Sequence, residues 1–252
     1  MKLTAKVFLL LLFIGGCKAI PSVQSVPFQR EKAVQFRYYD SDSKIRYAVS
    51  HDAENLYLQL NTTDRFSIRK IMRTGLSIYF DQSGKKKTEI SLQYPMPATI
   101  KASTGEANQR GGGARKAPNL QDQIDGLPKT AVFRTLEQTE AFQVSMESDI
   151  QVAITALNNQ ELSYRLKVPF SRIPSTLNTC YIGIISGKFS GSPNQGMQRP
   201  TRAQGGRPRG GRGGRPGGGG QGMGQGGRTQ AQNLAALTTP IEFWINVEGW
   251  SK

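Results

Sequence analysis

One stretch of the chain, residues 44–64, limits most strongly what the protein can fold into. It reads KIRYAVSHDAENLYLQLNTTD, in which apolar and polar residues alternate on both sides of a turn-prone segment, HDAEN. Alternation with a period of two is typical of β-strands that bury one face. The stretch therefore predicts a β-hairpin, and the apolar face of such a hairpin needs a second layer to cover it.

Short apolar runs of the same kind recur along the chain and bring the number of expected strands to about ten, separated by turn signals at short intervals. The further runs lie at 33–39, 75–80, 88–94, 131–136, 142–147, 152–157, 161–169, 180–186 and 240–247. Only 65–74, RFSIRKIMRT, has the apolar spacing of a short helix. The expected fold is all-β, a two-sheet antiparallel β-sandwich of the jelly-roll or immunoglobulin-like kind.

The N-terminus has the pattern of an export signal. Lys2 and Lys6 precede an apolar run at 7–14, VFLLLLFI. This run is short for a membrane-spanning helix, which favours a signal peptide. We therefore expect a signal peptide at 1–16, a tether at 17–32 and a single domain at 33–250.

The signal ends in Ile14-Gly15-Gly16-Cys17, which resembles the lipobox of bacterial lipoproteins. The resemblance implies cleavage before Cys17 and a lipid on its thiol, so that the lipid anchors the protein in the membrane of the cell envelope. Lys18 stands where an Asp implies retention in the inner membrane, so the implied location is the outer membrane. The alternative is an ordinary signal peptide with a chance cysteine.

The chain is strongly basic, with 33 Lys and Arg against 18 Asp and Glu and a net charge of +15. Much of this charge lies in a tract at 190–228 that holds seven arginines, no acid and sixteen of the 28 glycines. Such a composition buries too little apolar surface to offset the entropy of ordering it. Because a strand is expected after it, we interpret 190–230 as a long disordered Gly/Arg-rich loop inserted in the domain.

The tract resembles the RGG segments of RNA-binding proteins. Its central arginines are candidates for polyanion binding because guanidinium groups pair with phosphates and other anions. These candidates are Arg207, Arg209, Arg212 and Arg215. In an exported protein nucleic acid is not the expected partner, and lipopolysaccharide phosphates or an acidic glycan take its place. A spacer without any partner is the alternative.

Chemistry at a metal, cofactor or catalytic group has little support in the sequence. With Cys17 lipidated, Cys180 has no partner for a disulfide and is expected to be a buried apolar side chain. His51 is the only histidine and lies in the expected turn, so no His-rich metal site is expected. The acid pairs Asp40/Asp42 and Asp52/Glu54 are interpreted as turn residues, not as calcium ligands or acid–base pairs. No nucleophile-elbow, zinc or phosphate-loop motif is present, so we expect no enzyme, cofactor or metal.

Four segments, taken in their order along the chain, resemble one family. They are YAVSHDAENLYLQL at 47–60, GLSIYFDQSGKKK at 75–87, YRLKVPFSRI at 164–173 and IEFWINV at 241–247. They are similar to strands of family-nine-type carbohydrate-binding modules and the related DOMON sandwiches, and the resemblance spans most of 33–247. It implies a two-sheet sandwich that binds without catalysis. Some DOMON relatives hold haem, which the single His51 in a turn does not favour.

Candidate ligand-binding residues are aromatic, because sugar rings stack on exposed aromatic faces. Trp250, after Gly249, is the candidate best placed to be exposed. Trp244 follows Phe243 in an alternating strand, so only one of the two can face the core. Tyr39 is a further candidate, although such tyrosines more often pack within a sandwich. The expected function is a lipid-anchored, non-catalytic module that binds carbohydrate. The alternative is an accessory envelope lipoprotein whose basic loop docks a polyanion or a protein partner.

Overall fold

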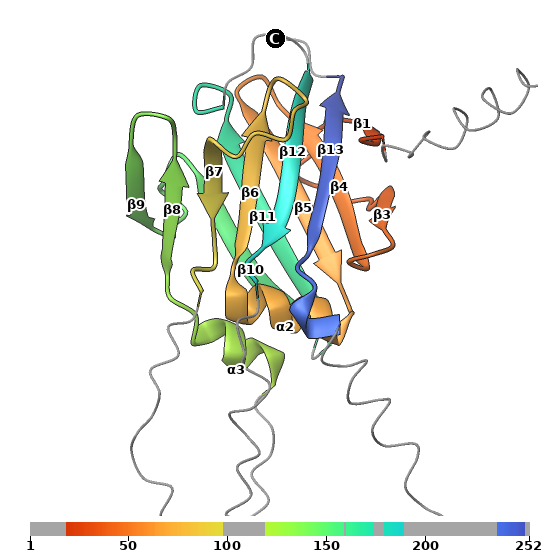
Figure 1. Ribbon diagram of the computed structural model, residues 1–252, viewed down its shortest axis with the longest axis vertical. Helices are drawn as coiled ribbons and strands as arrows, with labels where there is room; N and C mark the ends of the chain where they lie inside the picture. The colour runs from red at the N-terminus through yellow and green to blue at the C-terminus, as the bar shows by residue number, and fades with distance from the viewer. Residues whose placement is uncertain (1–18, 98–118, 159, 174–178, 189–235, 250–252) are drawn as a thin grey trace, which may run out of the picture.

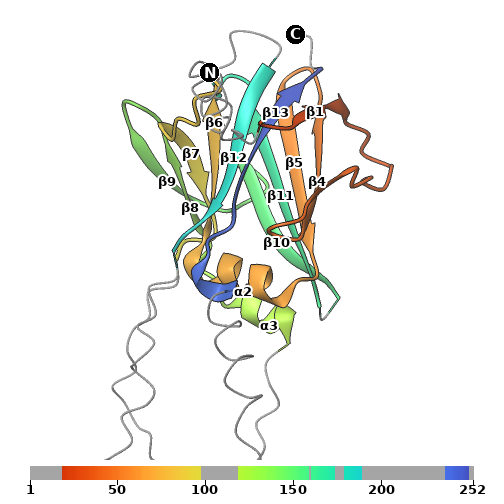
Figure 2. The same cartoon turned by 45° about the vertical axis from the view of Figure 1, so that its right-hand side comes forward.

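Two β-sheets pack face to face in the computed structural model, which describes residues 19–97, 119–158, 160–173, 179–188 and 236–249 (Figure 1). The all-β sandwich predicted from the sequence is confirmed. Figure 2 shows the two sheets from another side, with helices α2 and α3 at one end of the sandwich. We refer to this end as the helical end.

The two sheets contain thirteen strands, all within the described residues. The first sheet has the order β1-β13-β12-β6-β7-β8-β9. Its bounds are Ser22–Gln24 (β1), Glu242–Glu248 (β13), Thr179–Ser186 (β12), Leu76–Asp81 (β6), Ile90–Gln93 (β7), Thr130–Arg134 (β8) and Thr139–Gln143 (β9). The second sheet has the order β10-β11-β5-β4-β2, and β3 also pairs with β4. Its bounds are Gln151–Asn158 (β10), Glu161–Pro169 (β11), Asn55–Thr62 (β5), Ile45–His51 (β4), Val26–Pro27 (β2) and Tyr38–Asp40 (β3).

The hairpin predicted at 44–64 is confirmed as β4 and β5, which pair antiparallel. Asp52 fixes the turn between them, since its carboxylate accepts hydrogen bonds from the backbone N–H groups of Glu54 (2.9 Å) and Asn55 (2.7 Å). Alternate side chains of β5 then enter the core. These are Leu56, Leu58 and Leu60, each at most 1% exposed. Burying a leucine fully contributes about 2 kcal/mol, so this strand is a major source of stability.

The N-terminal segment predicted as a tether is partly built into the sandwich, which corrects the domain boundary expected at residue 33. β1 pairs with β13 of the first sheet, and β2 pairs with β4 of the second. Both pairings are parallel, so the sheets are mixed rather than purely antiparallel as predicted. Val23 of β1 is fully buried. The segment therefore connects the two sheets along one edge and is part of the folded domain.

The helix predicted at 65–74 is confirmed as α2, Arg65–Thr74. It begins at Asp64, whose side chain accepts hydrogen bonds from the backbone N–H groups of Phe66 and Ser67, and it ends at Gly75 with φ of 76°. Ile71 and Met72 of this helix are buried in the core. A second short helix, α3 (Leu120–Asp125), was not predicted.

The predicted insertion at 190–230 lies outside the described residues, as does the smaller Gly/Arg run at 111–116. The strands on either side of the larger tract, β12 and β13, are antiparallel neighbours. The chain therefore leaves β12 and re-enters β13 at the same end of the sandwich, which is the helical end (Figure 1). This arrangement requires no rearrangement of the sheet to accept an insertion.

Tyr164 gives a first stability prediction. It is 0% exposed, and its hydroxyl has no hydrogen-bond partner within the described part of the chain. An unsatisfied buried hydroxyl costs free energy, so we expect Tyr164→Phe to raise the free energy of unfolding by about 1 kcal/mol in urea titrations. Tyr57→Phe is the control, because the Tyr57 hydroxyl donates to Asp52 at 2.6 Å and its removal should lower stability. A loss of stability in Tyr164→Phe would contradict the prediction.

Candidate functional site

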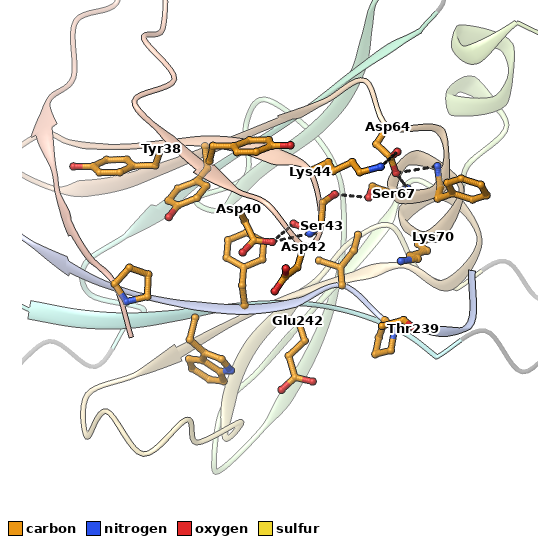
Figure 3. Close-up of a pocket in the computed structure, with 18 of the residues that line it drawn as sticks. Tyr38, Asp40, Asp42, Ser43, Lys44, Asp64, Ser67, Lys70, Thr239 and Glu242 are labelled. Atoms are coloured by element: carbon orange, nitrogen blue, oxygen red, sulfur yellow. Dashed lines mark hydrogen bonds and ion pairs between the residues drawn. The ribbon is translucent and has the colours of Figure 1, made fainter. Parts of the chain in front are cut away.

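A large cavity lies at the edge of the sandwich where β3 and β4 face the beginning of β13 (Figure 3). Its volume is about 910 Å³, and the N-terminal end of α2 contributes to its wall. We call it the edge pocket. Small-molecule sites in proteins commonly have volumes of about 300–1,000 Å³, so the edge pocket is large enough for a ligand of several rings.

A row of aromatic rings forms one wall of the edge pocket and ties the two sheets together. Tyr38 of β3 stacks on Tyr47 of β4 with ring centroids 5.5 Å apart, and Tyr47 in turn lies 5.5 Å from Phe243 of β13. Burial, with a further contribution from the charge of Asp40, raises the pKa of Tyr47 to about 12. Tyr47 therefore keeps its proton at neutral pH, and its ring is an uncharged part of the wall.

Asp64 joins three structural elements at the inner end of the edge pocket. One carboxylate oxygen caps α2 by accepting from the backbone N–H groups of Phe66 (3.2 Å) and Ser67 (2.9 Å). The other accepts from the Lys44 ammonium at 3.2 Å. Burial alone would raise the pKa of Asp64, but the hydrogen bonds from Ser67 and Lys44 outweigh it and hold the pKa below its usual range. Asp64 is therefore ionised at neutral pH.

Lys70 of α2 is a buried cation in the same pocket, only 8% exposed. Burial lowers the pKa of its ammonium, and the charge of Asp64 opposes that effect. Charges along the described lining are balanced. The carboxylates are Asp40, Asp42, Asp64 and Glu242, and the cations are Arg37, Lys44, Lys70 and Lys86. A lining of balanced charge with many hydroxyl groups suits an uncharged ligand rich in hydroxyls.

The Asp40/Asp42 pair, predicted as turn residues, lies in the bend between β3 and β4. Asp40 accepts hydrogen bonds from the backbone N–H (2.8 Å) and the hydroxyl (2.6 Å) of Ser43. Figure 3 shows both carboxylates between Tyr38 and Lys70, while Glu242 extends from the opposite strand away from them. The carboxylates are thus spread along the pocket instead of converging on one point.

A second, shallower cavity of about 390 Å³ lies on the outer face of the second sheet, next to the edge pocket. We call it the outer hollow. Tyr39, Arg46 and Asn61 line it and occupy directly opposed positions on β3, β4 and β5. Tyr39 also lines the edge pocket, so this one side chain stands between the two cavities.

Of the three predicted ligand-binding residues, one is exposed, one is buried and one lies outside the described residues. Tyr39 is 58% exposed and free to meet a ligand. Trp244 is only 5% exposed and lies against Gly183 and Tyr79, so it forms part of the pocket wall and is not an open platform. Phe243, not Trp244, faces the core. Trp250 lies outside the described residues.

Other predicted sites lie in the undescribed segments. They are Cys17, Arg207, Arg209, Arg212 and Arg215. Cys180 is buried, as predicted, and burial raises the pKa of its thiol to about 12. His51 ends β4, its Nδ1 lies 2.8 Å from the Ser25 hydroxyl, and burial lowers its pKa. His51 thus helps to hold the N-terminal segment against the second sheet.

Sequence reasoning missed important polar residues of each cavity, which are Arg46 and Asn61 in the outer hollow and Lys70 in the edge pocket. Arg46 and Asn61 occupy the polar positions of the alternating hairpin, which are ordinarily solvated. Only the pairing of strands brings them together beside Tyr39. Lys70 stands on a helix whose apolar spacing was recognised, but nothing in its local sequence indicates burial.

No protein family, curated protein or solved structure matches this chain. No cluster of three or more His, Cys, Asp or Glu side chains suited to a metal ion is found among the described residues. Within the same part of the chain, no helix combines the length and the apolar character needed to cross a membrane.

Proposed function

We propose that this protein is a non-catalytic binding module that holds carbohydrate in the edge pocket and is anchored by lipid at Cys17 in the cell envelope, on the outer membrane. The observation that carries the proposal is the lining of the edge pocket, which combines aromatic rings, hydroxyls and charges of both signs. Sugars are recognised by this combination, since their rings have apolar faces and their hydroxyls need both donors and acceptors.

The roles of Asp40 and Asp64 in the pocket favour binding over catalysis. Glycoside hydrolysis uses one carboxylic acid that keeps its proton near neutral pH and a second carboxylate facing it. Asp64 has a lowered pKa and serves as a helix cap, and Asp40 accepts two hydrogen bonds from Ser43. Both carboxylates are therefore committed to holding the local backbone. The order of segments similar to family-nine-type carbohydrate-binding modules and DOMON sandwiches supports the same proposal.

Tyr39→Ala tests the proposal. Tyr39 is the exposed aromatic side chain at the mouth of the edge pocket, so we expect the variant to bind neutral oligosaccharides about tenfold more weakly, equivalent to about 1.4 kcal/mol. The measurement is a calorimetric titration of the protein with a panel of neutral oligosaccharides. Leu136→Ala is the matched control, because Leu136 is 72% exposed in the turn between β8 and β9, far along the first sheet.

Two results would overturn the proposal. One is the absence of binding to every neutral oligosaccharide in the panel. The other is equal affinity for the Tyr39→Ala and Leu136→Ala variants. Binding that is confined to acidic glycans, falls steeply with salt and is lost on deletion of residues 190–230 would instead support the alternative, an accessory lipoprotein whose Gly/Arg tract docks polyanions.

A further inference from the structure

The outer face of the second sheet is polar, basic and built around two buried carboxamides. Gln59 and Asn61 of β5 alternate with the core leucines of the same strand, so their side chains leave the sheet on the outer side. They are nevertheless only 8% and 3% exposed. Neither side-chain amide makes a hydrogen bond to another residue that the structure describes. Neither residue has an atom among the fully buried polar atoms that lack a partner, so both amides still reach solvent and are open to a ligand.

The neighbours of these amides explain both their burial and their access to a ligand. Directly opposite Asn61 lie Arg46 of β4 and Ser163 of β11, and directly opposite Gln59 lie Ala48 and Arg165. Each amide thus has one long basic neighbour and one small neighbour. Asn61 lies in the wall of the outer hollow.

Positive charge predominates on this face, which we call the polar face. Arg46, Arg165 and Lys167 project from it, and none of the three forms an ion pair with another described residue. Three carboxylates lie nearby. Asp64 at the rim of the outer hollow is paired with Lys44, and Glu161 is the first residue of β11. Asp52 accepts a hydrogen bond from the hydroxyl of Tyr57, which lies opposite Lys167. The face therefore offers three cations without an ion-pair partner among the described residues, beside two amides.

We propose that the polar face binds an acidic polysaccharide, a chain that carries carboxylates on its sugar rings. Arg46 pairs with a sugar carboxylate, Asn61 exchanges hydrogen bonds with adjacent hydroxyls, and Tyr39 supports a ring at the boundary with the edge pocket. Arg165 and Lys167 meet the next acidic units along the chain. This inference goes beyond the proposed function, because the polar face is a second site next to the edge pocket, and Tyr39 lines both cavities.

Charge and chemistry favour this occupant over other polyanions. Carboxamides bind sugar hydroxyls by donating and accepting at once, and Asn61 and Gln59 supply both functions. Sequence-independent binding of single-stranded nucleic acid relies on several aromatic side chains along a basic groove. On the polar face Tyr39 is exposed, whereas Tyr57 is stacked on Phe28 with centroids 4.0 Å apart and donates its hydroxyl to Asp52. The polar face thus has one stacking platform and two amides.

The test compares Arg46→Gln with Arg134→Gln in binding to polygalacturonate and to a neutral galactan. Both variants lose one exposed positive charge, but Arg134 lies on β8 of the other sheet. Both also keep the Gly/Arg tract, so its contribution cancels when they are compared. We expect Arg46→Gln to bind polygalacturonate about tenfold more weakly at low salt, with a smaller difference at higher salt, because screening weakens exposed charge pairs. We expect no change for Arg134→Gln.

Asn61→Ala adds a variant that removes a hydrogen-bonding group without changing the charge. It should weaken binding to polygalacturonate at all salt concentrations while the melting temperature shows that the protein is folded. If Asn61→Ala does not fold, the exposed Arg46 still tests the proposal.

The outcomes separate this inference from the proposed function. Equal polygalacturonate affinity in Arg46→Gln and Arg134→Gln overturns the polar-face site, even where neutral oligosaccharides bind in the edge pocket. Binding of polygalacturonate that depends on Arg46, without any binding of neutral sugars, supports the polar-face site and overturns the edge-pocket proposal. Binding of single-stranded RNA that depends on Arg46, with no binding of polygalacturonate, overturns the inference in favour of nucleic acid.

Discussion

Gly183→Ala is expected to lower the free energy of unfolding by about 2 kcal/mol, a large effect for the addition of one methyl group. Gly183 is buried in β12, between Tyr79 of β6 and Trp244 of β13. A Cβ atom at this position would lie 2.7 Å from ring carbons of Trp244, closer than van der Waals contact allows. Trp244 is 5% exposed, so its ring has little room to move aside.

Gly126→Ala is the matched control for this prediction. A Cβ atom at Gly126 would lie 3.6 Å from its nearest neighbours, and the residue has φ of −79°, which alanine adopts without strain. Urea titrations of both variants should therefore show a loss for Gly183→Ala and a change within about 0.5 kcal/mol for Gly126→Ala. Equal stability of the two variants would contradict the prediction and show that the Trp244 ring can move away from position 183 without loss of stability.

The same contact has a consequence for binding, because Trp244 lines the edge pocket. Its ring lies over Gly183, and its centroid is 6.3 Å from that of Tyr79, within the range of favourable aromatic pairs. Displacing the ring changes the wall of the pocket as well as the packing. We therefore expect Gly183→Ala to shift the tryptophan fluorescence spectrum even under conditions in which the protein remains folded.

The sequence was sufficient to predict the sandwich because strand alternation is a local signal. Leu56, Leu58 and Leu60 repeat every second residue, and each is buried. The helix at 65–74 also has a local signal, its apolar spacing, and it formed where predicted. Both kinds of pattern arise from the geometry of a single element, so they can be recognised without knowledge of its neighbours.

The N-terminal strands were missed because their pairing is not local. β1 and β2 are three and two residues long, and β2 ends in Pro27. Neither is long enough to show alternation. β1 is held by β13, more than two hundred residues later, in a parallel pairing that no nearby turn specifies. Val23 is fully buried, but its burial depends on the assembled sheets and cannot be recognised from the segment alone.

The candidate sites were only partly predictable for a related reason. Tyr39 was named for its aromatic ring, and the structure places it between the two cavities. Arg46 and Asn61 are polar residues of a half-buried hairpin, and such residues are usually solvated without function. What distinguishes them is that both line the outer hollow together with Tyr39. The residues that lie opposite one another on neighbouring strands depend on how those strands pair. The hairpin sequence determines only the pairing of its own two strands, β4 and β5.

Asp64→Ala is the second substitution with a large expected effect, a loss of about 2 kcal/mol in the free energy of unfolding at pH 7. Loss of the cap on α2 accounts for about 1 kcal/mol. The remainder follows from Lys70, a buried ammonium that would lose the carboxylate opposing its desolvation. The exposed Lys44 contributes little, because ion pairs with exposed partners are weak.

Asp64→Asn separates the cap from the charge. Asparagine keeps a side-chain oxygen that can accept from the backbone N–H groups of Phe66 and Ser67, but it carries no negative charge. We therefore expect its loss of stability at pH 7 to be about half that of Asp64→Ala. If Asp64→Asn were as stable as the unmodified protein, the charge of Asp64 would have no role in the pocket.

The dependence of this difference on pH gives an independent check. Because the pKa of Asp64 is lower in the folded protein than in the unfolded chain, the unfolded chain takes up the proton first as the pH falls. The stability that the charge contributes is therefore fully present above the unfolded pKa of 3.8 and is lost as the pH falls through the folded value. Urea titrations should show the unmodified protein and Asp64→Asn converging toward pH 2. A gap that stays constant from pH 7 to pH 2 would mean that packing, not charge, distinguishes the two side chains.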